Sequence, residues 1–145
     1  MLKFLVHEWR FELVPELYRT QDKLSAIVIR RHTKVKDIEF FSPADFSQQI
    51  GLMARPSGYR VAPHVHNLIP REITQTQEVL IVRKGVCTVR LYGNSKIVEH
   101  EITLNEGDVI LLAHGGHEIE MLTDCELLEI KQGPYAGSSD KSPLF

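Results

Sequence analysis

The sequence predicts an all-β fold built from short antiparallel strands. Apolar and polar residues alternate over short runs, turn residues separate these runs at intervals of about 8–12 residues, and a helical period is almost absent. Strands of this length and spacing are typical of sandwiches and barrels. The chain has 145 residues, 43% hydrophobic and 25% charged, which indicates one globular domain over residues 1–145.

The alternation is clearest between residues 50 and 131. The runs predicted to form strands are 50–55, 59–66, 78–83, 86–92, 97–104, 109–113, 118–122 and 126–131. Pro56-Ser57-Gly58 favours a hairpin between the first two runs, and Gly85 and Gly93-Asn94-Ser95 supply later turns. We therefore expect residues 46–131 to form the main barrel and residues 132–145, rich in Gly, Pro and Ser, to form a tail.

Residues 1–45 are predicted to form an N-terminal extension, made either of outer strands or of an arm laid on a partner subunit. Within it, the β-branched residues of 24–29 favour a strand. Ser42 as N-cap, Pro43 at the first helical position and Asp45 at the third predict a short helix that ends near Gln49.

Charge and composition narrow the expected partners. The net charge of −2 gives no electrostatic reason to expect nucleic acid or acidic membranes as partners. No apolar run approaches the roughly 18–20 residues that span a bilayer, and the first ten residues lack the core of a secretion signal, so we expect a cytoplasmic protein. Cys87 and Cys125 form no CxxC pair and are interpreted as reduced, buried thiols, with a disulfide as the alternative.

The sequence His64-Val65-His66 carries the strongest chemical signal. In a strand, side chains at i and i+2 lie on one face about 6.5–7 Å apart, so both imidazoles can lean onto one metal ion with bonds of about 2.1 Å. Glu78 and His117, from other strands, would complete a shell of three imidazoles and one carboxylate. His114 is either a residue at the rim or the true third imidazole.

Strand parity supports the convergence of these groups. His117 shares a face with Ile119, and Glu78 shares a face with Leu80, so both polar side chains should point toward the core. A slip of one residue in the strand of Glu78 would turn Gln77 inward instead.

These residues resemble the first motif of the cupin superfamily, a double-sheet jelly roll, which reads Gly-x5-His-x-His-x3-4-Glu-x6-Gly. Gly58, His64 and His66 match its opening spacing, and Glu78 and Gly85 match its close. Eleven residues, 67–77, separate His66 from Glu78 where the family has three or four. We expect them to form a longer loop at the barrel mouth.

The second cupin motif, Gly-x5-Pro-x-Gly-x2-His-x3-Asn, is matched in part. Gly107 opens it and His117 resembles its histidine, but Ala113 replaces the proline and the turn is one residue shorter. Met121 stands near the usual asparagine, and a Gly-Gly pair supplies the flexibility of the turn. The resemblance covers residues 50–131.

The resemblance implies a cupin barrel, a homodimer, a small-molecule ligand and a divalent metal: Fe, Mn, Ni, Zn or Cu. The implied metal ligands are His64, His66, Glu78 and His117. Imidazole suits several of these metals, so the ligand types do not select one. Glu78 and His66 are the candidates for proton transfer, and the candidate substrate contacts are Arg71, Arg90, Tyr59 and Met121.

Three functions follow as alternatives. The first is a metal-dependent enzyme for a small oxygen-rich metabolite, a sugar derivative or carboxylate, by isomerase, oxygenase or lyase chemistry. The second is a metal-independent isomerase or epimerase of sugar nucleotides, with His64 or His66 as the base and His117 as its partner. The third is a non-catalytic module that binds or senses a small ligand. Fold alone does not choose among them.

Overall fold

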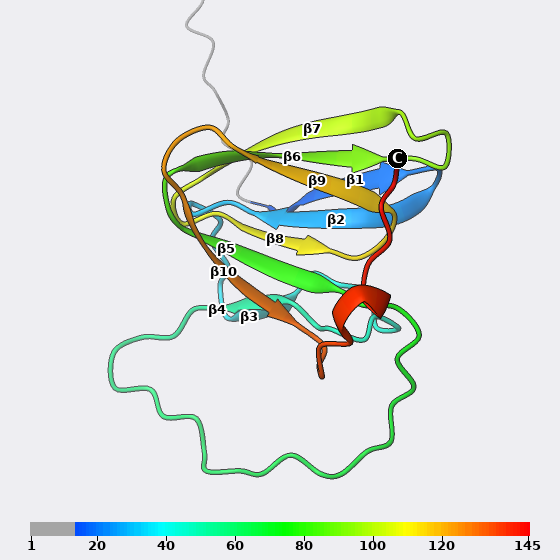
Figure 1. The fold of residues 1–145 in the computed structure, drawn as a ribbon. Helices are drawn as coiled ribbons and strands as arrows, with labels where there is room; N and C mark the ends of the chain where they lie inside the picture. Colours follow the sequence, from blue (N-terminus) through cyan, green and yellow to red (C-terminus); the bar gives the residue numbers. More distant parts are fainter. Residues whose placement is uncertain (1–13) are drawn as a thin grey trace, which may run out of the picture.

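The computed structural model describes residues 14–145, so the expectation for residues 1–13 lies outside the described part of the chain (Figure 1). Its elements are β1 (Glu16–Thr20), β2 (Lys23–Ile29), β3 (Ile38–Phe40), β4 (Gly51–Met53), β5 (Glu78–Lys84), β6 (Val86–Tyr92), β7 (Val98–Asn105), β8 (Val109–Leu112), β9 (Gly116–Met121), β10 (Glu126–Lys131) and the 3-10 turn η1 (Gly137–Ser139). Within these residues, no helix has the length and apolar character that crossing a membrane requires.

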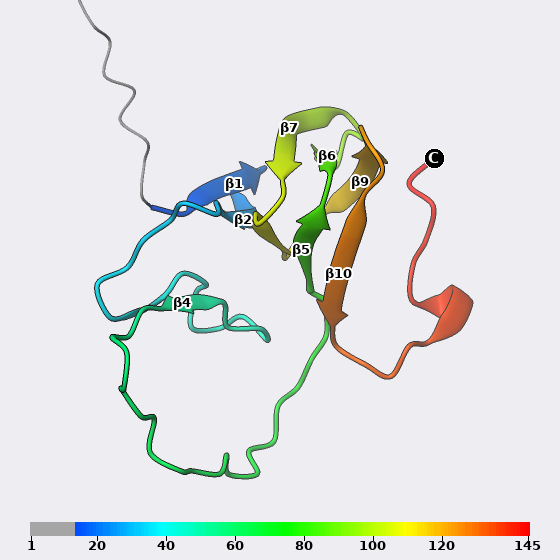
Figure 2. The same cartoon turned by 90° about the vertical axis from the view of Figure 1, so that its left-hand side faces the viewer.

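The strands form three antiparallel sheets, which confirms the all-β prediction. The largest has the order β1-β2-β8-β5-β10, a second has the order β7-β6-β9, and β3 and β4 form a small hairpin. Figures 1 and 2 show the second sheet lying over the first, and from β7 onward each strand lies in the layer opposite to that of the strand before it. Over residues 14–145 no sheet closes on itself, so the architecture is that of facing sheets.

The hydrophobic core lies between these two layers. Alternate residues of the strands face it, as a period of two requires. Its buried members are Ala26, Val28, Leu80, Val82, Cys87, Val89, Leu91, Ile102, Leu104, Ile110 and Leu112. A smaller cluster on the outer face of the five-stranded sheet contains Ile27 and Leu111, covered by Phe46 and Ile50.

The helix predicted after Ser42 is not formed. Residues 43–49 make turns, one of them closed by the N–H of Phe46 donating to the carbonyl of Pro43 at 3.1 Å. The hydroxyl of Ser42 accepts from the N–H of Ile50 at 2.9 Å, where a helix cap would have accepted from the next turn. Because Phe46 and Ile50 pack on the outer cluster, tertiary contacts override the local capping signal.

The strand and hairpin predicted for residues 59–66 are also not formed. β4 pairs with β3, and residues 54–77 form a long loop whose middle part stands clear of both sheets in Figures 1 and 2. Pro63 has no N–H to donate to a ladder, and the apolar side chains of Val61 and Val65 are exposed. Among residues 14–145, β9 therefore pairs with β6 alone.

Candidate functional site

Two polar side chains predicted to face inward meet between the sheets. His117 stands opposite the core residue Leu91, and side chains of directly opposite residues share one face of a sheet. Glu78 begins β5 and shares the inner face with Leu80 and Val82. Nε2 of His117 lies 3.3 Å from Oε2 of Glu78. The parity prediction is confirmed for these two residues.

A lysine and an acid extend this pair. Lys131 of β10 stands opposite Glu78 in the ladder, and its Nζ lies 3.8 Å from Oε1 of Glu78. The same ammonium lies 3.1 Å from Glu129 and donates to Oδ2 of Asp140 at 3.3 Å. The carboxylate of Glu129, together with that of Asp140, raises the pKa of Lys131 against the opposing effect of burial. The pair therefore belongs to a charged network at one end of the core.

A small cavity adjoins the pair. Its volume is about 140 Å³, and it is lined by Glu78, His117 and His114 together with residues from the loop before β5 and from the C-terminal segment. Nδ1 of His114 donates to Oε1 of Gln75 at 3.2 Å. Burial, with a smaller effect of nearby Lys23, lowers the pKa of His114 and so favours its neutral form. His114 thus lines the same cavity as Glu78 and His117.

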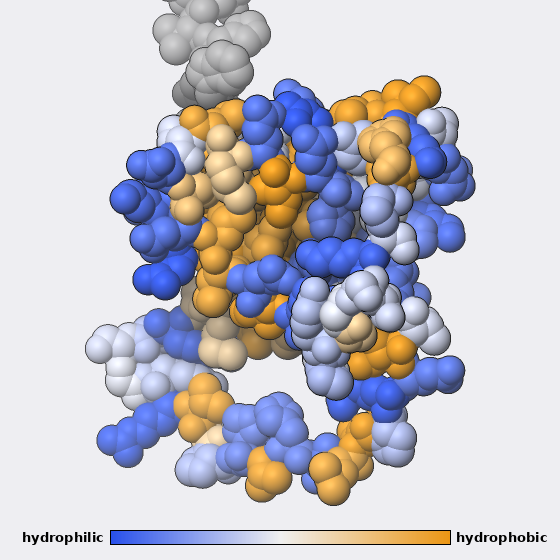
Figure 3. Space-filling model, viewed as in Figure 1, coloured by the Kyte–Doolittle hydropathy of each residue, from blue (hydrophilic) through white to orange (hydrophobic). Residues whose placement is uncertain are grey.

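His64 and His66 lie elsewhere, in the exposed 54–77 loop. Their rings are 5.2 Å apart in an edge-to-face arrangement, and Nδ1 of His64 donates to the carbonyl of Ala62 at 2.9 Å. Figure 3 shows open space between this loop and the body of the molecule. Over the described residues, no three side chains of His, Cys, Asp or Glu are grouped to hold a metal ion. As arranged, the four expected ligands fall into two separate pairs and do not fit a common metal.

The four expected substrate contacts are also divided. Tyr59 and Arg71 lie in the exposed loop, away from the cavity. Met121 stands opposite Cys87 and so takes the inner face of β9, but it lies at the far end of that strand and half of its surface is exposed.

Arg90 faces away from the core. It alternates along β6 with core residues, and its guanidinium contacts three carboxylates on the outer face: Glu101 at 2.7 Å, Glu118 at 3.3 Å and Glu120 at 2.6 Å. These three carboxylates balance the charge of Arg90 within the protein. Arg90 therefore links the strands of the three-stranded sheet on its outer face and does not face the cavity.

Two members of the network were missed as site residues from sequence. Lys131 had a usable signal, because its parity with Leu127 places it on the inner face, where an unpaired charge is costly. Asp140 had none, since its position depends on how the segment after β10 docks on the sheets.

The comparisons with known proteins add no relative. No family model, no curated protein and no solved structure matches this chain. The functional interpretation therefore rests on the geometry of the residues themselves.

Proposed function

We propose that Glu78 and His117 form the acid–base pair of an enzyme site for a small oxygen-rich metabolite, such as a sugar derivative. The observation that carries the proposal is the 3.3 Å contact between Nε2 of His117 and Oε2 of Glu78 beside a cavity. A histidine oriented by a carboxylate is a recurrent arrangement for proton transfer.

The contact assigns a role to each ring nitrogen. With its proton on Nε2 and directed at Glu78, the neutral imidazole of His117 keeps Nδ1 as its acceptor. Nδ1 would take a proton from the bound substrate, and the carboxylate of Glu78 would stabilise the imidazolium that results. Lys131, 3.8 Å from Glu78, offsets part of the negative charge of the resting site.

The order of the strands supports a cupin-type jelly roll as the scaffold. From β7 to β10 the chain alternates between the two facing sheets, as it does in a jelly roll. Among residues 14–145 the second edge of β9 has no partner strand, so a fourth strand could be added to this sheet there.

Deuterium exchange with solvent tests the proposal. The wild-type protein is incubated in D₂O with nucleotide sugars and with hydroxycarboxylates, and deuterium at carbon is measured by mass spectrometry. We expect incorporation into one of these compounds and a loss of about 10²-fold or more in His117→Gln. His32→Gln, at an exposed histidine outside the cavity, is the matched control. An undiminished rate in His117→Gln would refute the assignment of the base.

A second candidate is a divalent-metal site, favoured by the adjacent rings of His64 and His66 and by the free edge of β9. If residues 59–66 paired with β9, the two histidines would approach Glu78 and His117. Elemental analysis of untagged protein and of His64→Ala/His66→Ala tests this candidate: stoichiometric metal that the double substitution removes would support it. Metal retained in the double variant would exclude this ligand set.

A further inference from the structure

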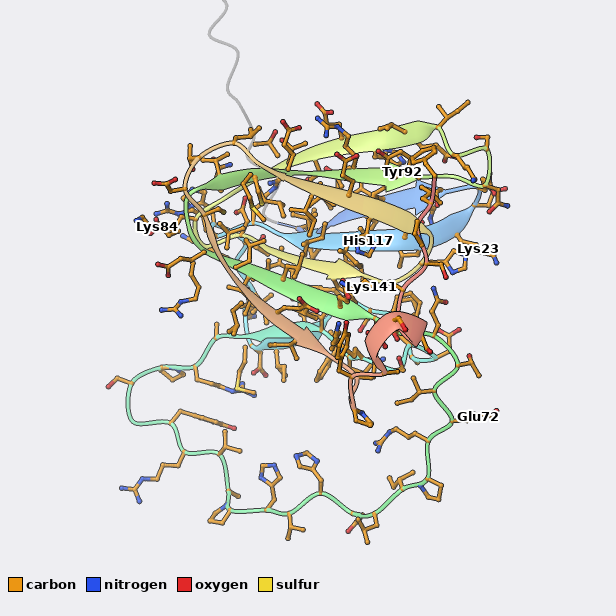
Figure 4. All side chains as sticks on the ribbon, in the orientation of Figure 1. Lys23, Glu72, Lys84, Tyr92, His117 and Lys141 are labelled. Carbon is orange, nitrogen blue, oxygen red and sulfur yellow. The ribbon has the colours of Figure 1, made fainter. Side chains whose placement is uncertain are left out.

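The C-terminal segment, residues 133–145, forms one wall of the candidate site. After β10 it passes through η1 and runs past the sheets toward the end of β6, as both ribbon views show (Figures 1 and 2). Asp140 and Lys141 line the same cavity as Glu78 and His117. Figure 4 shows Lys141 on this segment beside His117.

Two contacts attach the segment to the sheets. Asp140, near its middle, accepts from Lys131 at 3.3 Å. At its end, the ring of Phe145 packs edge-to-face on Tyr92 with 5.8 Å between centroids. Leu144 packs against Gly116, where an added Cβ would come within 3.0 Å of the leucine side chain.

These attachments are weak compared with a strand ladder. Ser142 and Pro143, between them, are exposed, as is Phe145 itself. One ion pair and one aromatic pair are far fewer interactions than a strand ladder makes, so the segment can detach while the sheets stay folded.

The volumes of the cavities give a reason for such detachment. The cavity at Glu78 and His117 measures about 140 Å³, whereas pockets for small molecules usually span about 300–1,000 Å³. A neighbouring cavity of about 230 Å³ shares His114 and Gly115 with it and is bounded by Leu144. Together the two volumes reach the range of a metabolite site, and the C-terminal segment lines both.

We propose that residues 133–145 are a lid that gates the Glu78–His117 site. In the closed state the lid divides the space into two small cavities. When the Asp140 and Phe145 attachments open, the cavities join and a ligand of metabolite size can enter. The inference rests on the proposed function because it concerns access to the same site.

The accessibility of His117 to diethyl pyrocarbonate tests the lid. The rate of modification at His117 is measured by peptide mass spectrometry in the full chain and in Asp140→Asn/Phe145→Ala. The side chain is 33% exposed in the closed state, so opening of the lid should raise the rate by up to about threefold. His32, exposed and outside the cavity, is the internal reference, and Ser142→Ala is the control within the lid.

A second variant distinguishes a change in the exposure of His117 from an effect of removing the charge of Asp140. Leu144→Ala/Phe145→Ala leaves every ionisable side chain near His117 unchanged and should also raise its rate of modification. An unchanged rate in both folded variants would overturn the lid, as would unchanged amide exchange of residues 133–145 in both. Neither readout requires turnover, so failure of the lid is distinguished from failure of the acid–base proposal, which the deuterium experiment measures.

Discussion

His117 and Glu78 join the two layers of the fold, because β9 belongs to the three-stranded sheet and β5 to the five-stranded sheet, yet their side chains lie 3.3 Å apart. A contact across two layers depends on the spacing of the sheets and on the direction of both side chains. It is therefore sensitive to small changes in either partner.

Replacing the carboxylate should change the tautomer of His117. In the wild-type protein we expect the neutral ring to carry its proton on Nε2, held by Glu78, and in Glu78→Gln we expect a mixture of both tautomers. Long-range ¹H–¹⁵N spectra of the histidine rings distinguish these states. His100, which donates from Nε2 to the carbonyl of Arg19 at 2.7 Å, should not change. A Nδ1-protonated His117 in the wild-type protein contradicts the proposed role of the ring.

The buried carboxylate of Asp108 should be important for stability. It accepts from Arg30 at 3.0 Å and from the backbone N–H groups of Arg31 at 2.9 Å and Asn105 at 3.0 Å, while the same guanidinium also binds Glu16. Asp108→Ala should lower the free energy of unfolding by about 3 kcal/mol, as expected when a buried ion pair loses one partner.

Urea denaturation measures this change. The matched control is Glu106→Ala, two residues earlier and exposed, which should change stability by less than about 0.5 kcal/mol. Equal losses of unfolding free energy in both variants would contradict a stabilising role for the hydrogen bonds and ion pair of Asp108.

The thiol of Cys87 should make the fold sensitive to alkali. Burial, with a contribution from Cys125, raises the pKa of Cys87 to about 11 from an ordinary value of 9.0. In the unfolded chain the thiol ionises first, so its contribution is complete below pH 9.0 and is lost as the pH rises toward about 11. Over this window the loss should approach about 1.4 kcal/mol per pH unit.

Urea unfolding of the wild-type protein and of Cys87→Ala across this pH range isolates the effect. The difference in stability between the two should shrink as the pH rises, because only the wild-type protein loses the contribution of Cys87. The pKa of Tyr18 is also raised, but Tyr18 is present in both proteins and its effect cancels. A difference that stays constant with pH would mean that Cys87 ionises as easily in the folded state as in the unfolded chain.

Gly85 should tolerate no side chain. Its φ of +83° is unfavourable for other residues, and a Cβ would overlap the carbonyl oxygen of Asp124 in the β9–β10 turn. Gly58 has a similar φ of +84° with no atom within 4 Å of the added Cβ. Gly58→Ala should cost about 1 kcal/mol, and Gly85→Ala about 1–3 kcal/mol more. Thermal melts of both variants measure the two costs, and equal costs would exclude a steric role for Asp124.

The alternation of residues along the chain predicted the elements that face the core. β2 and β5 to β10 were expected within one or two residues of their observed bounds. The inward direction of Glu78 and His117 followed as well, because side-chain direction in a strand alternates with a period of two whatever the strand pairs with.

The alternation of residues did not predict which strands pair with each other, or how the segments between strands pack on the sheets. Residues 59–66 alternate like a strand, yet β4 pairs with β3 and leaves them in a loop. Ser42 has the local signature of a helix cap, but the packing of Phe46 and Ile50 on the outer cluster directs its hydroxyl to another backbone group.

By itself, the sequence determined the all-β class, most of the strands and the faces of Glu78 and His117, since these depend on the spacing of near neighbours. Only the tertiary structure decided that His64 and His66 lie apart from that pair, and that Lys131 and Asp140 join it. The physical reason is that contacts between distant segments depend on the free energy of all competing pairings, which no local pattern contains.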